Sequence, residues 1–448
     1  APWREVRPAL DYGTASPQGG KEPNQSEDCL FLNVWTPALD RGRRPVLVYI
    51  HGGAYSTGSG SSPLYDGARL AARGDVVVVT LNHRLNVFGY GYLARLAPGF
   101  EDSGNAGQLD LILALRWVQA NIAAFGGDPR CVTLFGQSGG GAKIATLMAT
   151  PAAAALFHRA MTMSGQQVTA SGPMNATARA EAFLKTAGLT AEQAATAPVE
   201  RLVRALEARD PVLPFGSVYF GPVLDERSLN RHPFYPDAPA QSAAIPMIIG
   251  NTRDETRAFL AGDPRNFALT WEELPKRLAP ELRVDISPEL VATEYRRLYP
   301  AYSPSEVFFA ASTASRSWRG AVIEAERRAE QGAPTWVYQL DFPSPLQEGR
   351  LRAHHAIDIP LVFDNTAAPG ASTGDGLQAR RLAEQMSAAL LAFARTGDPN
   401  HSGLPTWSRF DLERRRTMIF DVNCRMEDDP RGAERRLFAK VPYVQPGT

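Results

Sequence analysis

The sequence has no excess of charge of either sign, since 47 lysines and arginines balance 47 aspartates and glutamates. Neither nucleic acid nor an anionic membrane surface is therefore expected as a partner. Long apolar runs are missing too, and the longest candidates, such as residues 75–81, have the length of a strand rather than of a membrane span. The sequence also lacks internal repeats and low-complexity tracts, which excludes repeat architectures.

Cysteine is scarce. Cys29, Cys131 and Cys424 form no C-x-x-C motif and offer no zinc framework, but they leave open one disulfide or three free thiols. We expect no metal and no cofactor. The chain starts at Ala1, without an initiator Met or a basic-then-apolar leader. We expect a soluble protein with a slight preference for export, and the compartment and the oligomeric state stay open.

The chain contains a regular succession of apolar strands. Apolar residues make up 44% of the sequence, which is enough for a sizeable core. Continuous apolar strands separated by helices predict an α/β fold in one domain, residues 1–448, with a mostly parallel, doubly wound sheet covered on both faces. The predicted strands are 30–35, 45–50, 76–81, 131–134, 161–164, 245–250, 336–340 and, as the last, 417–421. The predicted helices include 68–73, 109–125, 142–149 and 376–396.

Two long segments, about 166–243 and 256–333, interrupt this succession. The first has helical patches broken by Pro and Gly, and the second carries many of the aromatic residues. Because the strand pattern resumes after each, we interpret them as insertions rather than separate domains, and we expect them to cover the substrate site. The aromatic residues of the second insertion form either an apolar wall of that site or a small core of their own.

One predicted strand runs through residues 136–140 (GQSGG) directly into a helix. In such a strand–turn–helix, G-x-S-x-G holds its serine in a strained, exposed turn, which is typical of a nucleophile. The pattern alone should arise by chance roughly 0.2 times in a chain of this composition. A second match, 370–374 (GASTG), has no strand before it and no helix directly after it, so we interpret it as a loop. The context therefore favours Ser138.

A nucleophilic serine needs a base, an acid that orients the base, and donors for the oxyanion. On a sheet of this kind the acid and then the histidine follow later strands. The candidates in these places are the acids Asp254 and Glu255 and the histidines His354 and His355. His401 is also late enough, but it lies in a predicted surface turn. Taken singly, such residues are usually solvated or packed, but their order favours catalysis, and the choice within each pair stays open.

The loop 51–54 (HGGA) follows the strand 45–50 at the carboxyl edge of the sheet. Its two glycines suit a plain tight turn. They also suit half of an oxyanion hole, whose other half is the N–H of Gly139. The small Ala54 after the two glycines favours the oxyanion hole.

Five motifs occur in one order between residues 27 and 140. They are 27–34 (EDCLFLNV), 51–55 (HGGAY), 82–85 (NHRL), 125–129 (FGGDP) and 135–140 (FGQSGG). This set resembles the type-B carboxylesterases, a family that includes para-nitrobenzyl esterases and cholinesterases. The resemblance runs from about Trp3 to Val441 and implies an α/β-hydrolase fold with a Ser–His–Glu triad.

The resemblance also implies roles for single residues. Residues 250–255 resemble the acid loop of the family and imply Glu255, and residues 355–363 resemble the segment that starts with the catalytic histidine and imply His355. The implied site consists of the triad Ser138, Glu255 and His355, the oxyanion donors Gly53, Ala54 and Gly139, and the supporting residues Ser164 and Gln137. Ser164 matches a second serine near the triad, a hydrogen-bond partner of the acid. Arg84 and Asp128 match a buried structural ion pair.

The sequence departs from the family pattern in several places. Gln137 stands where a Glu is usual, which removes a negative charge beside the serine. Gly139 replaces an Ala and is expected to loosen that oxyanion donor, and Thr256 replaces a common Gly. The chain begins about fifty residues into the family's fold. The N-terminal β segment of the family is therefore expected to be absent, which would leave the site open to large substrates.

Together these features predict a serine hydrolase that cleaves small-molecule carboxylic esters through an acyl-enzyme. One alternative is a hydrolase of the same fold acting on amides, lactones or polyesters. A second is a non-catalytic binding protein of the same fold, but such members lack triad residues. The acyl and alcohol groups of the substrate stay open.

Overall fold

The computed structural model describes residues 8–213, 216–445 and 447, so Trp3, where the resemblance begins, lies outside the described residues. Within them, a nine-stranded sheet has the strand order β1-β3-β2-β4-β5-β6-β7-β8-β9. All neighbouring strands are parallel except β1–β3 and β8–β9 at the edges. The predicted mostly parallel sheet is thus confirmed. The strands are β1 Leu32–Trp35, β2 Arg44–Ile50, β3 Val77–Leu81, β4 Gly127–Gln137, β5 Arg159–Met163, β6 Met247–Thr252, β7 Thr335–Leu340, β8 Arg416–Phe420 and β9 Arg425–Asp428.

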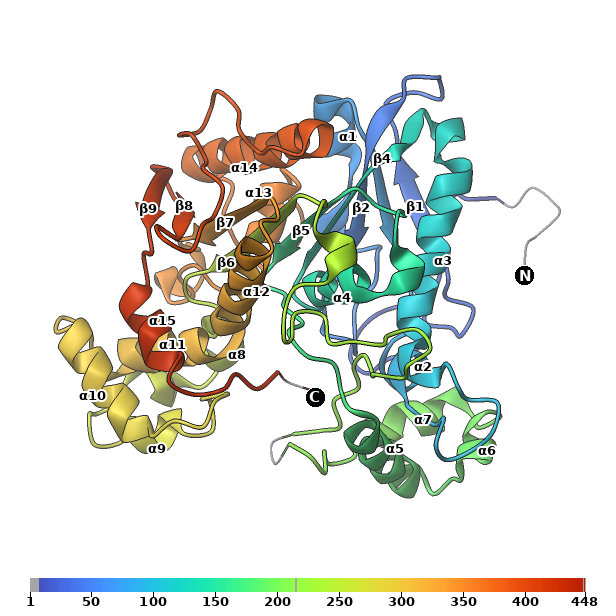
Figure 1. The fold of residues 1–448 in the computed structure, drawn as a ribbon, viewed down its shortest axis with the longest axis horizontal. Coiled ribbons are helices and arrows are strands. Elements are labelled where there is room, and N and C mark those ends of the chain that lie inside the picture. The colour runs from blue at the N-terminus through green and yellow to red at the C-terminus, as the bar shows by residue number, and fades with distance from the viewer. Residues whose placement is uncertain (1–7, 214–215, 446, 448) are drawn as a thin grey trace.

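Helices cover both faces of the sheet, and Figure 1 shows α4 and α12 crossing in front of it. The helices are α1 Ala68–Gly74, α2 Asn86–Tyr90, α3 Ala106–Asn121, α4 Gly139–Ala149, α5 Pro173–Ala187, α6 Ala191–Ala194, α7 Val199–Ala205, α8 Arg257–Leu260, α9 Leu274–Leu278, α10 Pro288–Leu298, α11 Pro304–Thr313, α12 Arg319–Glu330, α13 Asp358–Val362, α14 Leu377–Thr396 and α15 Gly432–Phe438. The side chains of β2 alternate between two cores. Leu47 and Tyr49 pack with α1, α13 and α14, and Val46 and Val48 pack with α3, α4 and α12. Burial on both faces explains why the strand is continuously apolar.

Each predicted insertion packs around a core that is separate from the two cores of the sheet. Helices α5 and α7, which Figure 1 shows at the lower right, pack around Phe183, Leu202 and Phe220, and residues outside the insertion, such as Tyr90, complete this core. Helices α9, α10, α11 and α15 pack around Tyr295 and Phe308, with Trp271 and Trp318 at the margin of this core. Most aromatic residues of the second insertion therefore stabilise the insertion itself.

The structure corrects the expected partner of Arg84. Arg84 pairs with Asp110 on α3, where its Nη2 is 2.7 Å from Oδ1, and not with Asp128. Asp128 lies near Arg130 at 3.4 Å and Arg43 at 3.8 Å. The reason is topological. Arg84 follows the carboxyl end of β3, whereas Asp128 lies at the amino end of β4. Because β3 and β4 run in the same direction, these two residues lie at opposite ends of the strands.

The prediction that residues 417–421 form the last strand was wrong, because β9 follows β8 as an antiparallel edge strand. The side chains of β9 are exposed or half-buried, so its sequence, Arg-Met-Glu-Asp, carries no apolar pattern.

The three cysteines are free thiols. No helix among the described residues is long and apolar enough to cross a membrane.

Candidate active site

Ser138 occupies the sharp turn between β4 and α4, at the carboxyl end of a central strand. Its φ of 57° and ψ of −128° are rare for a residue with a side chain, so surrounding contacts must hold it there. One such contact is the N–H of Ser138, which donates to the carbonyl of Met163 at 2.7 Å. A Cβ at Gly140 would collide with the carbonyl of Ile50, which explains the glycine two residues after the serine. The packing thus holds the Ser138 side chain half-buried at the carboxyl ends of the parallel strands.

Glu255 and His355 form a close pair beside this turn. The Nδ1 of His355 is 2.5 Å from Oε2 of Glu255, which is fully buried in the loop after β6. Their sequence neighbours have other partners. Asp254 forms an ion pair with Arg257 at 3.3 Å, and Nδ1 of His354 faces the carbonyl of His355 at 2.7 Å. Of the two acids and two histidines that chain order leaves open, the structure brings together Glu255 and His355, the pair that the family resemblance implies.

The buried carboxylate of Glu255 is stabilised by several donors. Its Oε1 accepts the N–H of Thr252 at 2.9 Å and the side-chain amide of Asn251 at 3.3 Å. Ser164, which the resemblance implies as a partner of this carboxylate, is buried nearby, but its Oγ forms no hydrogen bond with the described residues. Burial raises the pKa of Glu255, but attraction to His355 and these hydrogen bonds outweigh burial and lower the pKa below its usual value. Glu255 is therefore a carboxylate that can orient the imidazole.

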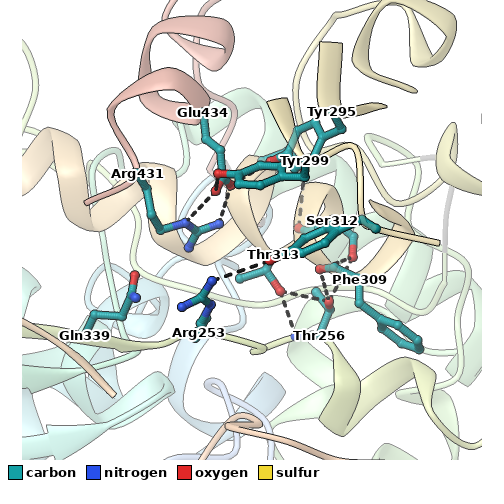
Figure 2. A network of polar contacts seen from close by, with 12 residues as sticks. Arg253, Thr256, Tyr295, Tyr299, Phe309, Ser312, Thr313, Gln339, Arg431 and Glu434 are labelled. Atoms are coloured by element: carbon teal, nitrogen blue, oxygen red, sulfur yellow. Dashed lines mark hydrogen bonds and ion pairs between the residues drawn. The ribbon is translucent and has the colours of Figure 1, made fainter. Parts of the chain in front are cut away.

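Thr256, which stands where the family commonly has Gly, anchors the acid loop to α11. Its hydroxyl lies 2.8 Å from the Ser312 hydroxyl, 2.9 Å from the Thr313 hydroxyl and 3.1 Å from the Phe309 carbonyl. Figure 2 shows these three contacts converging on Thr256. The side chain thus fixes the backbone next to Glu255 to the second insertion.

The expected oxyanion loop lies against the start of α4. Gly53 and Ala54 both have positive φ, 83° and 53°, which turns the loop sharply after β2. A Cβ at Gly139 would collide with the backbone of Ala54, so the glycine at this position permits a close approach between the loop and the helix start. The N–H groups of Gly53, Ala54 and Gly139 are thus carried by two adjoining segments next to Ser138.

Gln137 contacts the catalytic-histidine candidate directly. Its Nε2 is 3.1 Å from Nε2 of His355, whereas no hydrogen bond joins Ser138 to His355 in the described part of the chain. When Nδ1–H of a neutral imidazole donates to Glu255, Nε2 carries the lone pair that accepts from Gln137. Catalytic hydrogen bonds are often long or poorly aligned until substrate binds. Gln137 therefore occupies Nε2, the nitrogen that the Ser138 hydroxyl would have to contact if His355 is the base.

The Gln137→Glu variant should move the acid limb of the kcat/KM profile toward higher pH, by roughly one pH unit. The reason is that a carboxylate 3.1 Å from His355 Nε2 would stabilise the protonated imidazole, which cannot act as a base. The measurement is kcat/KM for p-nitrophenyl acetate between pH 5 and pH 9. Gln137→Met, of similar size and without charge, should leave the limb in place, and an unmoved limb in Gln137→Glu would contradict this role.

Lys143 was missed in the sequence analysis, although it is the only charged residue in the otherwise apolar α4. It is fully buried, and its Nζ donates to the carbonyl of His51 at 3.1 Å. Burial lowers the pKa of Lys143 to about 7. His51 stacks on His83 at 5.0 Å, and burial, followed by the charge of Lys143, lowers the pKa of both imidazoles. Lys143 thus links the helix after Ser138 to His51, the first residue of the loop 51–54.

Replacing Lys143 by Met should raise the free energy of unfolding by several kcal/mol at pH 6 and by much less at pH 9.5. The folded-state pKa of Lys143, about 7, lies below the ordinary lysine value of 10.5. Below about pH 7 the side chain is charged in both states, so burial of the charge destabilises the folded protein by its full amount. This cost shrinks as the pH rises from about 7 towards 10.5. Urea unfolding of both proteins at the two pH values measures the difference. Lys185→Met on the exposed face of α5 is the control, and a gain at Lys143 that does not change with pH would contradict the expectation.

An aromatic side chain lies next to His355. The ring of Phe259, on α8, is 5.0 Å from the imidazole ring, and 49% of Phe259 is exposed. The guanidinium of Arg316 lies 4.9 Å from the centre of the Phe259 ring. Unlike the aromatic residues in the core of the second insertion, Phe259 is therefore available to a substrate.

Comparisons with known proteins agree with this geometry. The model of the carboxylesterase family matches residues 1–438. The para-nitrobenzyl esterase of Bacillus subtilis (strain 168) is 36% identical over 460 residues, covering 97% of this chain and 89% of the relative. Among solved structures, the carboxylesterase EST55 of Geobacillus stearothermophilus at pH 6.2 superposes with a TM-score of 0.85 at 39% identity, covering 97% of this chain and 90% of that one. An esterase from Clostridium hathewayi that can hydrolyse aliphatic aromatic polyesters has a TM-score of 0.80 at 34% identity, covering 98% and 90%.

Proposed function

This chain belongs to the carboxylesterase family and is a carboxylic ester hydrolase of the α/β-hydrolase fold, and on that premise we propose that Ser138, His355 and Glu255 are its catalytic triad. The main support is the 2.5 Å contact between His355 Nδ1 and the buried Glu255, beside a serine held in a strained turn. The donors to the oxyanion are the N–H groups of Gly53, Ala54 and Gly139.

The reaction proceeds through an acyl-enzyme. Ser138 Oγ attacks the ester carbonyl while Nε2 of His355 takes its proton, and Glu255 stabilises the imidazolium that forms. The oxyanion collapses, and the alcohol leaves with the proton from His355. Water then repeats the sequence on the acyl-enzyme and releases the carboxylic acid. Before the first step, the Ser138 hydroxyl must replace the Gln137 amide at Nε2.

Partitioning of the acyl group between water and methanol tests for this intermediate. Acetate esters of different alcohols should give one common ratio of methyl acetate to acetate, because all of them pass through the same acetyl-enzyme. A ratio that changes with the leaving alcohol would contradict the mechanism.

We further propose that the second insertion covers part of the substrate site and that the substrate carries an aromatic group. Phe259 supports this, because its exposed ring lies 5.0 Å from the ring of His355 and aromatic pairs attract one another at such distances. The names of the Bacillus subtilis and Clostridium hathewayi relatives also refer to aromatic groups. Benzyl acetate should therefore have a higher kcat/KM than cyclohexylmethyl acetate, and the reverse order would contradict the proposal.

A further inference from the structure

A hollow lies between α12, β7, β8 and α15. It holds about 480 Å³ of space, including the part open to solvent, and its lining includes no triad residue. One side is apolar and is formed by Trp318, Ala321 and Ala325 together with Val337 and Phe410. An apolar wall of this kind, set beside a few polar groups, is typical of a site for a small organic molecule.

The other side of the hollow is cationic. Arg415, Arg431 and Arg435 line it, with Asp429 as the only acidic lining residue. Each arginine has one carboxylate partner: Glu326 for Arg415, Glu434 for Arg431 and Asp429 for Arg435. Two further arginines adjoin these carboxylates, Arg319 at 3.9 Å from Glu326 and Arg436 at 3.8 Å from Asp429. Five guanidinium groups thus share three carboxylates.

Arg431 carries a donor without a partner. Only 7% of Arg431 is exposed, and its Nε and Nη2 bind Glu434, as Figure 2 shows, whereas its Nη1 has no hydrogen-bond partner among the described residues. The Arg431 guanidinium also lies 4.2 Å from the Trp318 ring at the apolar side. A buried donor of this kind is costly unless a ligand binds it.

A second guanidinium in this cluster is also short of partners. Nε and Nη1 of Arg319 are buried without hydrogen bonds in the described part of the chain. Burial lowers the pKa of Arg319, and repulsion from Arg435 and Arg415 adds to this effect against the attraction of Glu326. The cluster therefore favours an additional negative charge.

We propose that this hollow is a binding site for a small carboxylate with an aromatic or apolar body. The carboxylate binds Arg431 and Arg435, and the body packs on Ala325 and Trp318. The protein's own reaction releases carboxylic acids, so ligands of this class form wherever it works. A hydrogen bond connects the hollow to the triad: Asn251 lines the hollow, and its side-chain amide donates to Glu255 at 3.3 Å.

Calorimetric titration with benzoate tests the proposal. The enzyme is first inactivated with diisopropyl fluorophosphate, so that benzoate cannot occupy the catalytic pocket. One benzoate should bind per chain, and benzamide, which has nearly the same shape without the charge, should bind at least about tenfold more weakly. No binding of benzoate, or equal binding of benzamide, would overturn the proposal.

Two variants locate the binding. Arg435→Gln removes a charge from the lining, and Val322→Phe fills the hollow from α12, so each should weaken benzoate binding about tenfold or more. Arg327→Gln on α12 is the matched control, because Arg327 pairs with Glu330 and does not line the hollow. Circular dichroism verifies that each variant is folded. Unchanged binding in both folded lining variants, or an equal loss in Arg327→Gln, would overturn the assignment to this hollow.

Discussion

The Ser138→Ala variant should lose roughly 10⁴–10⁶-fold in kcat toward p-nitrophenyl acetate while its fold stays intact. The loss is large because the variant has no group that can form the acyl-enzyme. The fold should persist because Ala has a Cβ like Ser, and the contacts that hold this turn, such as the N–H of residue 138 with the Met163 carbonyl, belong to the backbone. Steady-state kinetics and thermal unfolding measure the two effects.

Ser372→Ala is the matched control, because it changes the serine of the second G-x-S-x-G match. That segment is a loop in the structure, as predicted, and the Ser372 carbonyl accepts a hydrogen bond from the Ser344 hydroxyl. Ser372→Ala should therefore keep wild-type kcat. Wild-type activity in Ser138→Ala, or a comparable loss in Ser372→Ala, would show that Ser138 is not the nucleophile.

The Glu255→Gln variant should lower kcat about 10⁴-fold with little change in packing. An amide of the same size presents no negative charge to Nδ1 of His355, so the imidazole loses its orientation and its stabilised cation. The donors Thr252 N–H and Asn251 also lose a charged acceptor. Kinetics at saturating substrate separate this loss from an effect on binding.

The neighbouring residues serve as controls for this variant. Asp254→Asn should change kcat only slightly, because Asp254 pairs with Arg257 and does not contact His355. His354→Gln should likewise have a small effect, since Nδ1 of His354 contacts only a backbone carbonyl. A larger loss in Asp254→Asn than in Glu255→Gln would reverse the assignment of the acid.

The sequence predicted the sheet well where burial dictates composition. Strands such as β2 and β3 are buried on both faces, so their apolar runs are continuous and easy to recognise. The edge strand β9 was missed because its exposed side chains leave no apolar pattern. The prediction that Arg84 pairs with Asp128 was wrong, because an ion pair forms only between residues at the same end of the strands. The family resemblance gave no information on which ends these two residues occupy.

The site could be predicted only in part, for a similar reason. Chain order limits the acid and the base to two adjacent pairs, and the family resemblance implies Glu255 and His355 within them. The three-dimensional structure adds the contacts: Glu255 faces His355 at 2.5 Å, while Asp254 faces Arg257. The contact between Gln137 and His355 joins residues 218 positions apart. Lys143 left one signal, a lone charge in an apolar helix, but its contact with the His51 carbonyl depends on how α4 packs under the oxyanion loop.

The most direct test of the central claim is covalent labelling of the native enzyme with diisopropyl fluorophosphate, followed by peptide mass spectrometry. A serine activated by His355 and Glu255 should react far faster than any other hydroxyl in the chain. The account predicts one phosphoryl group per chain, located on Ser138, with activity lost in proportion to labelling. Inactivation with the label on any other residue, or full activity after Ser138 is labelled, would contradict it.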